Sequence, residues 1–150
     1  MIQERSGNRY KAPKLRHILP RQRLLSALED RKDRKVFLIV GKAGQGKSSL
    51  SADFLDRNHL QHTWLNLSAE EKDPKLLLQR FKEALAQYPT EKPNSQGEEL
   101  SLDALLRRLR ELKTHDHYIV LDNYQTINPS RDVGELLEQL IAVLPENLPL

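Results

Sequence analysis

The chain has 150 residues, enough for one domain with a hydrophobic core, and its 38% hydrophobic and 30% charged residues describe a soluble globular protein. Its net charge of +3 is too small to indicate nucleic-acid binding by itself, and the absence of cysteine excludes disulfides and thiolate metal sites. No apolar run reaches transmembrane length and no signal-peptide core begins the chain, so we expect a cytoplasmic protein without membrane contact.

Residues 1–19 are predicted to be a basic, irregular lead-in. They form either an arm over an anionic ligand, such as a nucleotide or nucleic acid, or a solvated segment, and the charge pattern favours the solvated segment. A short helix is then expected to begin at Pro20, with an apolar stripe of Leu24, Leu25 and Leu28.

The next stretch combines a strand, a glycine-rich loop and a helix. Val36–Val40 is β-branched and aromatic, which predicts a buried strand. Residues 41–48 then fit the pattern G-x-x-x-x-G-K-[ST] without a mismatch, and apolar residues follow at helical spacing. A chance glycine-rich turn would lack these flanks, so the stretch predicts a phosphate-binding P-loop and hence a nucleotide-binding protein.

Each part of this loop has a physical role. Glycines let the backbone N–H groups surround a phosphate, and the helix N-terminus adds a favourable dipole. Lys47 is expected to reach the β- and γ-phosphates, and the Ser48 hydroxyl to ligate Mg²⁺. The loop residues predicted to bind the nucleotide are Gly41, Lys42, Ala43, Gly44, Gln45, Gly46, Lys47 and Ser48.

A second strand is expected from His62 to Leu67, followed by an acidic turn at 68–72 and a helix that begins at Asp73-Pro74. Residues 89–97 have the composition of a surface loop. A helix over 101–113 follows. Its arginines, Arg107, Arg108 and Arg110, form either a phosphate sensor or a solvated helix face, and the pattern favours the solvated face.

Tyr118–Asp122 is an apolar strand that ends in a carboxylate. Placed about eighty residues after a P-loop, this pattern predicts a Walker B element rather than a turn-capping aspartate, with Asp122 opposite Ser48 at the Mg²⁺ site. His115 and His117 precede the strand and lack a third ligand, so a turn is favoured over a metal site. A capping-box-like start at Asp132 and Glu135 predicts the last helix, and Leu148–Leu150 has the form of a further strand.

Together these blocks resemble the signal-transduction ATPases called STAND, in particular the MalT-like branch of the LuxR-type transcriptional regulators. The similarity covers about residues 12–150, and the block around Trp64 distinguishes it from a generic P-loop protein. The resemblance implies a bound ATP with Mg²⁺, Lys47 and Asp122 as catalytic residues, Ser49 in the phosphate loop, and Arg21 near the adenine side of the pocket.

The resemblance has two departures. The loop begins G-K-A-G, nearer to NACHT-type relatives. Asn123 stands where the family often has a second acidic residue, and an amide cannot accept a proton from the attacking water. Glu70 and Glu71 are conceivable substitutes, but nothing in the sequence places them near a γ-phosphate. Slow hydrolysis, or a nucleotide used as a bound switch, therefore gains support.

The family fold is a parallel α/β sheet flanked by helices, in the strand order 5-1-4-3-2 that STAND and AAA+ proteins share. On this basis residues 20–150 are expected to be the N-terminal part of a P-loop NTPase domain, truncated before the fourth strand. The resemblance also implies C-terminal sensor and effector domains outside this chain, self-association in the ATP-bound state, and DNA binding only through those other regions.

Three functions remain open. The first is the ATP-binding module of a signalling ATPase and transcriptional regulator. The second is a small P-loop kinase, which requires residues 36–40 to pair directly with residues 118–122. The third is a non-catalytic interaction module that binds a nucleotide for stability, and Asn123 is its main support.

Overall fold

The computed structural model describes residues 9–15, 19–32, 36–88, 101–111, 117–127 and 130–144. The predictions for His115, residues 89–97 and residues 145–150 lie outside these ranges. The elements follow in the order α1 (Gln22–Glu29), α2 (Lys47–Arg57), β1 (His62–Asn66), η1 (Ala69–Lys72), α3 (Pro74–Leu85), α4 (Leu102–Arg110), β2 (Tyr118–Asp122), η2 (Tyr124–Thr126) and α5 (Arg131–Val143).

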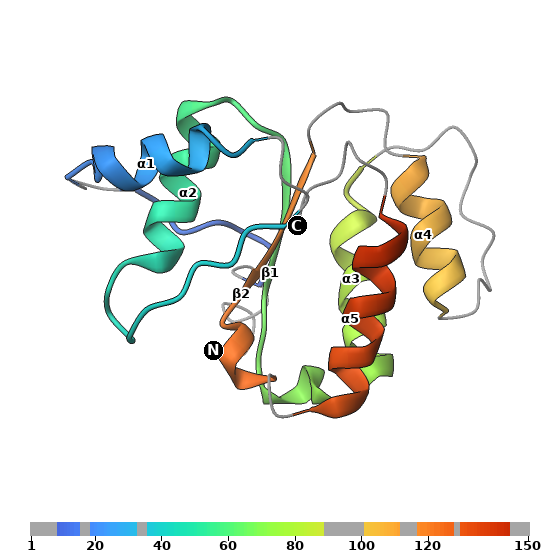
Figure 1. Ribbon diagram of the computed structural model, residues 1–150. Helices are drawn as coiled ribbons and strands as arrows, with labels where there is room; N and C mark the ends of the chain where they lie inside the picture. The colour runs from blue at the N-terminus through green and yellow to red at the C-terminus, as the bar shows by residue number, and fades with distance from the viewer. Residues whose placement is uncertain are drawn as a thin grey trace, which may run out of the picture.

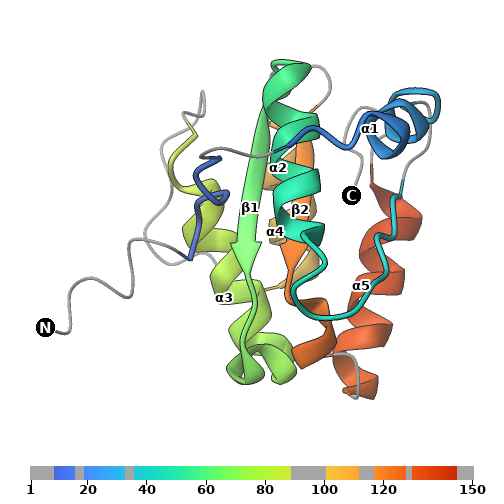
Figure 2. The same ribbon diagram turned by 90° about the vertical axis from the view of Figure 1, so that its left-hand side faces the viewer.

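The centre of the fold is a parallel pair of strands between two layers of helices (Figure 1). β1 and β2 pair in register from His62 opposite Tyr118 to Asn66 opposite Asp122. α3, α4 and α5 cover one face of the pair, and α1 and α2 cover the other, as Figure 2 also shows. Neighbouring strand residues alternate between the layers, so that Trp64 packs under α2 while Leu65 packs under α3. The pairing of the second and third expected strands agrees with the predicted sheet order.

The expected buried strand at Val36–Val40 is not formed, and this prediction was wrong. The segment makes no ladder with another described strand, and Val36, Leu38 and Val40 are 40%, 78% and 83% exposed. Phe37 and Ile39 still pack on the core beneath α2. A strand needs a partner for its backbone groups, and strand propensity alone does not supply one.

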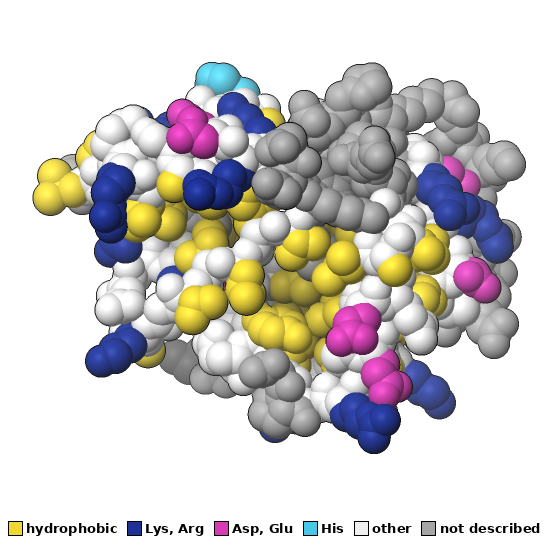
Figure 3. Space-filling view, viewed as in Figure 1, with side chains coloured by type: hydrophobic (Ala, Val, Ile, Leu, Met, Phe, Trp, Pro, Cys, Tyr) yellow, Lys and Arg dark blue, Asp and Glu magenta, His cyan; other side chains and the backbone are white. Residues whose placement is uncertain are grey.

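A hollow of about 410 Å³ lies between this segment and β2. Its walls are the segment 36–39, β2 and the inner side of α5. Hydrophobic side chains line this hollow, which lies in the middle of the face shown in Figure 3. Among the described residues, 36–40 therefore does not pair with 118–122 as the kinase alternative requires.

Side-chain oxygens cap η1, α3 and α4, whereas α1, α2 and α5 have no side-chain cap. Asp73 caps α3 through the Lys75 N–H and Pro74 occupies the first turn, as predicted. α1 begins at Gln22 rather than Pro20, with Arg21 as its N-cap. α5 begins at Arg131 with Ser130 as its N-cap, so Asp132 lies inside the helix and the predicted capping box is not formed. The Glu135 carboxylate pairs with the Arg131 guanidinium at 2.9 Å.

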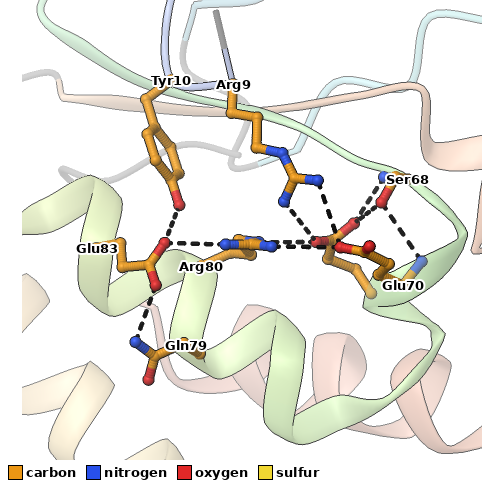
Figure 4. Close-up of polar contacts among 8 residues, drawn as sticks. Arg9, Tyr10, Ser68, Glu70, Gln79, Arg80 and Glu83 are labelled. Carbon is orange, nitrogen blue, oxygen red and sulfur yellow. Dashed lines mark hydrogen bonds and ion pairs between the residues drawn. The ribbon is translucent and has the colours of Figure 1, made fainter. Parts of the chain in front are cut away.

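The described part of the lead-in is anchored rather than solvated, which corrects the favoured prediction. The Arg9 carbonyl accepts a hydrogen bond from the Asn66 N–H at 2.8 Å. In Figure 4 the Arg9 guanidinium points at the carboxylates of η1, 3.3 Å from Glu70 and 3.7 Å from Glu71. The Tyr10 hydroxyl donates to Glu83 on α3. Acidic side chains far along the chain therefore hold Arg9 and Tyr10, and Ala12 and Leu15 pack on the hydrophobic core.

Glu71 is the buried centre of this polar network, with 1% of its surface exposed. It closes a capping box with Ser68 and accepts from Arg80 Nε at 2.9 Å. Burial alone raises the pKa of Glu71, but the hydrogen bonds from Arg80 and Ser68 outweigh it and hold that pKa below its usual range. The carboxylate therefore remains charged inside the fold.

His117 is fully buried directly before β2, where the predicted turn meets the strand. Its Nε2 lies 2.8 Å from Thr63 Oγ1, and the Tyr88 ring meets it edge-on at 4.9 Å. Burial, with a smaller effect of His62, lowers the pKa of His117 to about 4. The described residues contain no group of three or more side chains that could hold a metal ion.

We expect Glu71→Gln to lower the free energy of unfolding by about 3 kcal/mol, because it removes the charge from a buried ion pair. Glu70→Gln is the matched control: the Glu70 side chain is 60% exposed, and its loss should cost less than about 1 kcal/mol. Urea unfolding of both variants measures the difference. Equal, small losses would contradict a central role for Glu71.

The burial of His117 predicts a pH dependence of stability. The pKa of His117 is about 4 in the folded protein and 6.5 in the unfolded chain. Between pH 4 and pH 6.5 the unfolded chain therefore binds more protons than the folded protein. Stability should fall as the pH drops from 6.5 to 4, by about 3 kcal/mol in total. His117→Gln should flatten this slope, whereas His59→Asn, at an exposed position, should leave it unchanged. Urea midpoints at several pH values provide the test.

Candidate functional site

The glycine-rich loop leads directly into the N-terminus of α2. Gly44 and Gly46 have φ angles of 78° and 75°, in the left-handed region that favours glycine. Gly46 is the N-cap of α2 and has no side chain to cap the first N–H groups of the helix. These donors and the positive end of the helix dipole are therefore open to an anion.

The loop is held together by two of its own side chains. Lys47 Nζ donates to the carbonyls of Gly41 and Lys42 at 2.9 and 3.0 Å, so the ammonium arches back over the loop. Gln45 Oε1 accepts from the Lys42 N–H at 2.8 Å. A Cβ on Gly41 would lie 2.7 Å from this oxygen, so a larger residue there would have to displace the Gln45 side chain. The loop is thus pre-shaped by its own contacts.

The structure brings Ser48 and Asp122 together from 74 residues apart. Ser48 Oγ, in the first turn of α2, donates to Asp122 Oδ1 at the end of β2 over 2.7 Å. Asp122 Oδ1 also accepts from the Asn123 N–H at 2.9 Å. A hydroxyl and a carboxylate are oxygen ligands of the kind that Mg²⁺ prefers, so this pair fits the predicted ion.

The other predicted nucleotide-binding residues also lie along this loop. Ser49 follows Ser48 in the first turn of α2, while Lys42 and Ala43 are exposed at the loop. The Arg21 guanidinium extends from the start of α1 to Gly46. All the predicted residues therefore lie on α2, on the loop or directly against it, apart from Asp122 on β2.

Two amide side chains stand beside Asp122. Asn123 has φ 60° and donates through Nδ2 to Asn66 Oδ1 at 2.5 Å. Asn66 ends β1 directly opposite Asp122, so the two strands deliver their polar ends to one place. Sequence analysis missed Asn66. The available signal was a polar residue at the end of an apolar strand. Only the pairing of the two strands shows that this residue lies opposite Asp122.

The proposed substitutes for a general base are engaged elsewhere. The Glu70 carboxylate lies beside Arg9 and Arg80 in Figure 4. Glu71 pairs with the same two arginines, and all four pairs are within 3.7 Å. Both residues stabilise η1 and α3. The structure therefore gives no support to either as a base.

The arginines of α4 divide into two groups. Arg107 and Arg110 are exposed, as a solvated helix face predicts. Arg108 is half-buried instead, and its Nη2 donates to the carbonyls of Leu85 and Tyr88 at 2.8 and 2.5 Å. It joins α4 to the end of α3 and has a structural role.

A parallel α/β fold with a glycine loop before a helix, and a serine of that helix bonded to an aspartate at a strand end, defines a P-loop NTPase. The family model described as AAA domain matches residues 29–147. The chain therefore belongs to the AAA domain family of nucleotide-binding P-loop proteins, whose members generally bind ATP and Mg²⁺. None of the curated proteins compared with the chain matches it. No helix in the described ranges is long and apolar enough to cross a membrane.

Proposed function

We propose that this AAA domain is the ATP-binding regulatory module of a STAND-type signalling ATPase that controls transcription. In this proposal the P-loop holds Mg²⁺·ATP as a switch, and hydrolysis is slow. The observation that carries it is the contact between Ser48 and Asp122, which joins the phosphate loop to the carboxyl end of β2. The resemblance of the Trp64 block to STAND proteins supports the regulatory role.

The residues divide the work of binding. The open N–H groups of α2 donate to phosphate oxygens, and Lys47 exchanges its two carbonyl partners for the β- and γ-phosphates. Ser48 and Asp122 hold Mg²⁺, which neutralises charge on the phosphates when bound. The reaction, where it occurs, is in-line attack of water on the γ-phosphate.

Slow hydrolysis follows from the side chains at the strand ends. Asn123 and Asn66 are amides bonded to each other, and neither accepts a proton from water. Asp122 is bonded to Ser48 and belongs to the ion site. Glu70 and Glu71 are held in ion pairs. A long-lived bound nucleotide suits a switch better than a fast enzyme.

We also propose that residues 20–150 form the N-terminal part of a larger domain, with a further strand in the hollow between 36–40 and β2. The exposed Leu38 and Val40, and the edge of β2 that faces away from β1, support this. A right-handed crossover from β2 through α5 leads to that side of the sheet, since α5 covers the same face as α3 and α4. Sensor and effector domains, self-association with ATP and DNA binding through other regions belong to the same proposal.

The second candidate is a non-catalytic module that binds the nucleotide for stability alone. The pair of amides at Asn66 and Asn123 favours it over the kinase alternative, for which the described residues lack the required strand pairing. Both remaining candidates share the site and differ only in turnover.

Mg²⁺·ATP should raise the melting temperature of the protein by mass action, with about 2.7 kcal/mol of stabilisation at one hundred times Kd. Lys47→Ala should abolish this shift, because Lys47 supplies the charge at the β- and γ-phosphates. Lys75→Ala removes an equal charge at an exposed position of α3 and should keep the full shift. A normal shift in Lys47→Ala would exclude the loop as the site. Thermal scans with and without Mg²⁺·ATP measure it.

Asn123→Asp should speed single-turnover ATP hydrolysis by roughly tenfold or more, because a carboxylate then stands where an amide cannot act as base. Aspartate tolerates the left-handed backbone, and the Asn66 amide can turn to donate to it. Asn123→Gly is the matched control, since it keeps the backbone and adds no carboxylate. Equal rates for the two variants would show that the missing carboxylate is not what limits turnover.

A further inference from the structure

We propose that Arg21 binds the phosphate groups of the nucleotide rather than its base. This inference rests on the proposed function and assigns a specific role within it. It departs from the resemblance, which implies a place for Arg21 near adenine.

The Arg21 guanidinium lies against the glycine at the mouth of the phosphate loop. A Cβ on Gly46 would be 3.1 Å from Nη2, 3.4 Å from Cζ and 3.7 Å from Nη1, so the whole group faces the Cα of Gly46. Gly46 precedes Lys47 and is the N-cap of α2. The guanidinium is therefore placed at the helix end whose N–H groups are open to an anion.

The position of Arg21 follows from the packing of its helix. It is the N-cap of α1, which packs against α2 through Leu25 in the core that Phe54 and Leu55 share. A short helix fixed in this way holds the base of the side chain close to the loop. The guanidinium therefore reaches Gly46 from a helix that is fixed by the core.

The donors of Arg21 are available to a ligand. Within the described ranges its side chain makes no hydrogen bond or ion pair, and the residue is exposed. The Arg80 guanidinium, by contrast, is already paired with three carboxylates. A planar guanidinium with free paired N–H groups matches the geometry of phosphate oxygens, which it can bind in a bidentate manner.

The local charges favour the same ligand. The end of the α2 dipole, the Lys47 ammonium and the Arg21 guanidinium are all positive and lie around one loop. Like charges at this spacing repel one another, and a polyphosphate relieves the repulsion that a neutral adenine ring does not. The φ of 75° favours glycine at position 46, and a Cβ there would crowd the Arg21 guanidinium at 3.1 Å.

The test compares two ligands, Mg²⁺·ATP and Mg²⁺·tripolyphosphate, which carries the phosphates without a base. Isothermal titration calorimetry gives Kd for the parent protein, Arg21→Gln and Arg21→Lys. Arg23→Gln, which removes the same charge from the exposed side of α1, is the control. We expect Arg21→Gln to raise the Kd of both ligands by the same factor, about tenfold or more. Arg21→Lys should restore part of the lost affinity.

If Arg21→Gln lowers the affinity for Mg²⁺·ATP but not for Mg²⁺·tripolyphosphate, Arg21 contacts the base and the proposal is overturned. Unchanged Kd values for both ligands would also overturn it. Circular dichroism of the unliganded variants confirms that each is folded, and Arg21→Lys carries the test should Arg21→Gln be unfolded. Failure of the proposed function is a separate result, because then the parent protein binds neither ligand or Lys47→Ala binds both normally.

Discussion

The parallel pairing of β1 with β2 is the interaction on which the candidate site depends. It aligns Asn66 with Asp122, and the Leu67 N–H extends the ladder by donating to the Asp122 carbonyl at 3.0 Å. Both strands therefore end at one level, and the left-handed backbone of Asn123 turns the chain immediately afterwards. A one-residue slip would move Asp122 to the other face of the sheet and away from Ser48.

The same pairing explains why so many polar groups are buried away from the site. His117 and Thr63 meet inside the fold where the strands begin, and Glu71 is enclosed where the chain leaves β1. Each group is satisfied by hydrogen-bond partners, because a buried polar group without one would cost several kcal/mol. These contacts fix the register at both ends of the strands, and α3 and the segment 9–15 then lock β1 from outside.

Local rules in the sequence were enough to predict the loop, the aspartate and most helices. The phosphate loop is a contiguous motif, and Asp73-Pro74 carries its own cap, so neither depends on distant residues. The prediction of a strand at Val36–Val40 was wrong because a strand needs a neighbour to pair with, and no described strand pairs with this segment. Arg9 and Asn66 were missed for the same reason: their partners are 61 and 57 residues away, and no local pattern announces them.

The chemistry around the loop separates binding from catalysis. The helix N-terminus, Lys47 and, in our proposal, Arg21 all attract negative charge that ATP already carries before it reacts. Interactions that hold ground state and transition state alike tighten binding without speeding the chemical step. Acceleration needs a group that acts on the attacking water, and the strand ends beside Asp122 carry the amides of Asn66 and Asn123. In our proposal the site therefore binds polyphosphate well and hydrolyses it slowly, which is the combination that a nucleotide-dependent switch requires.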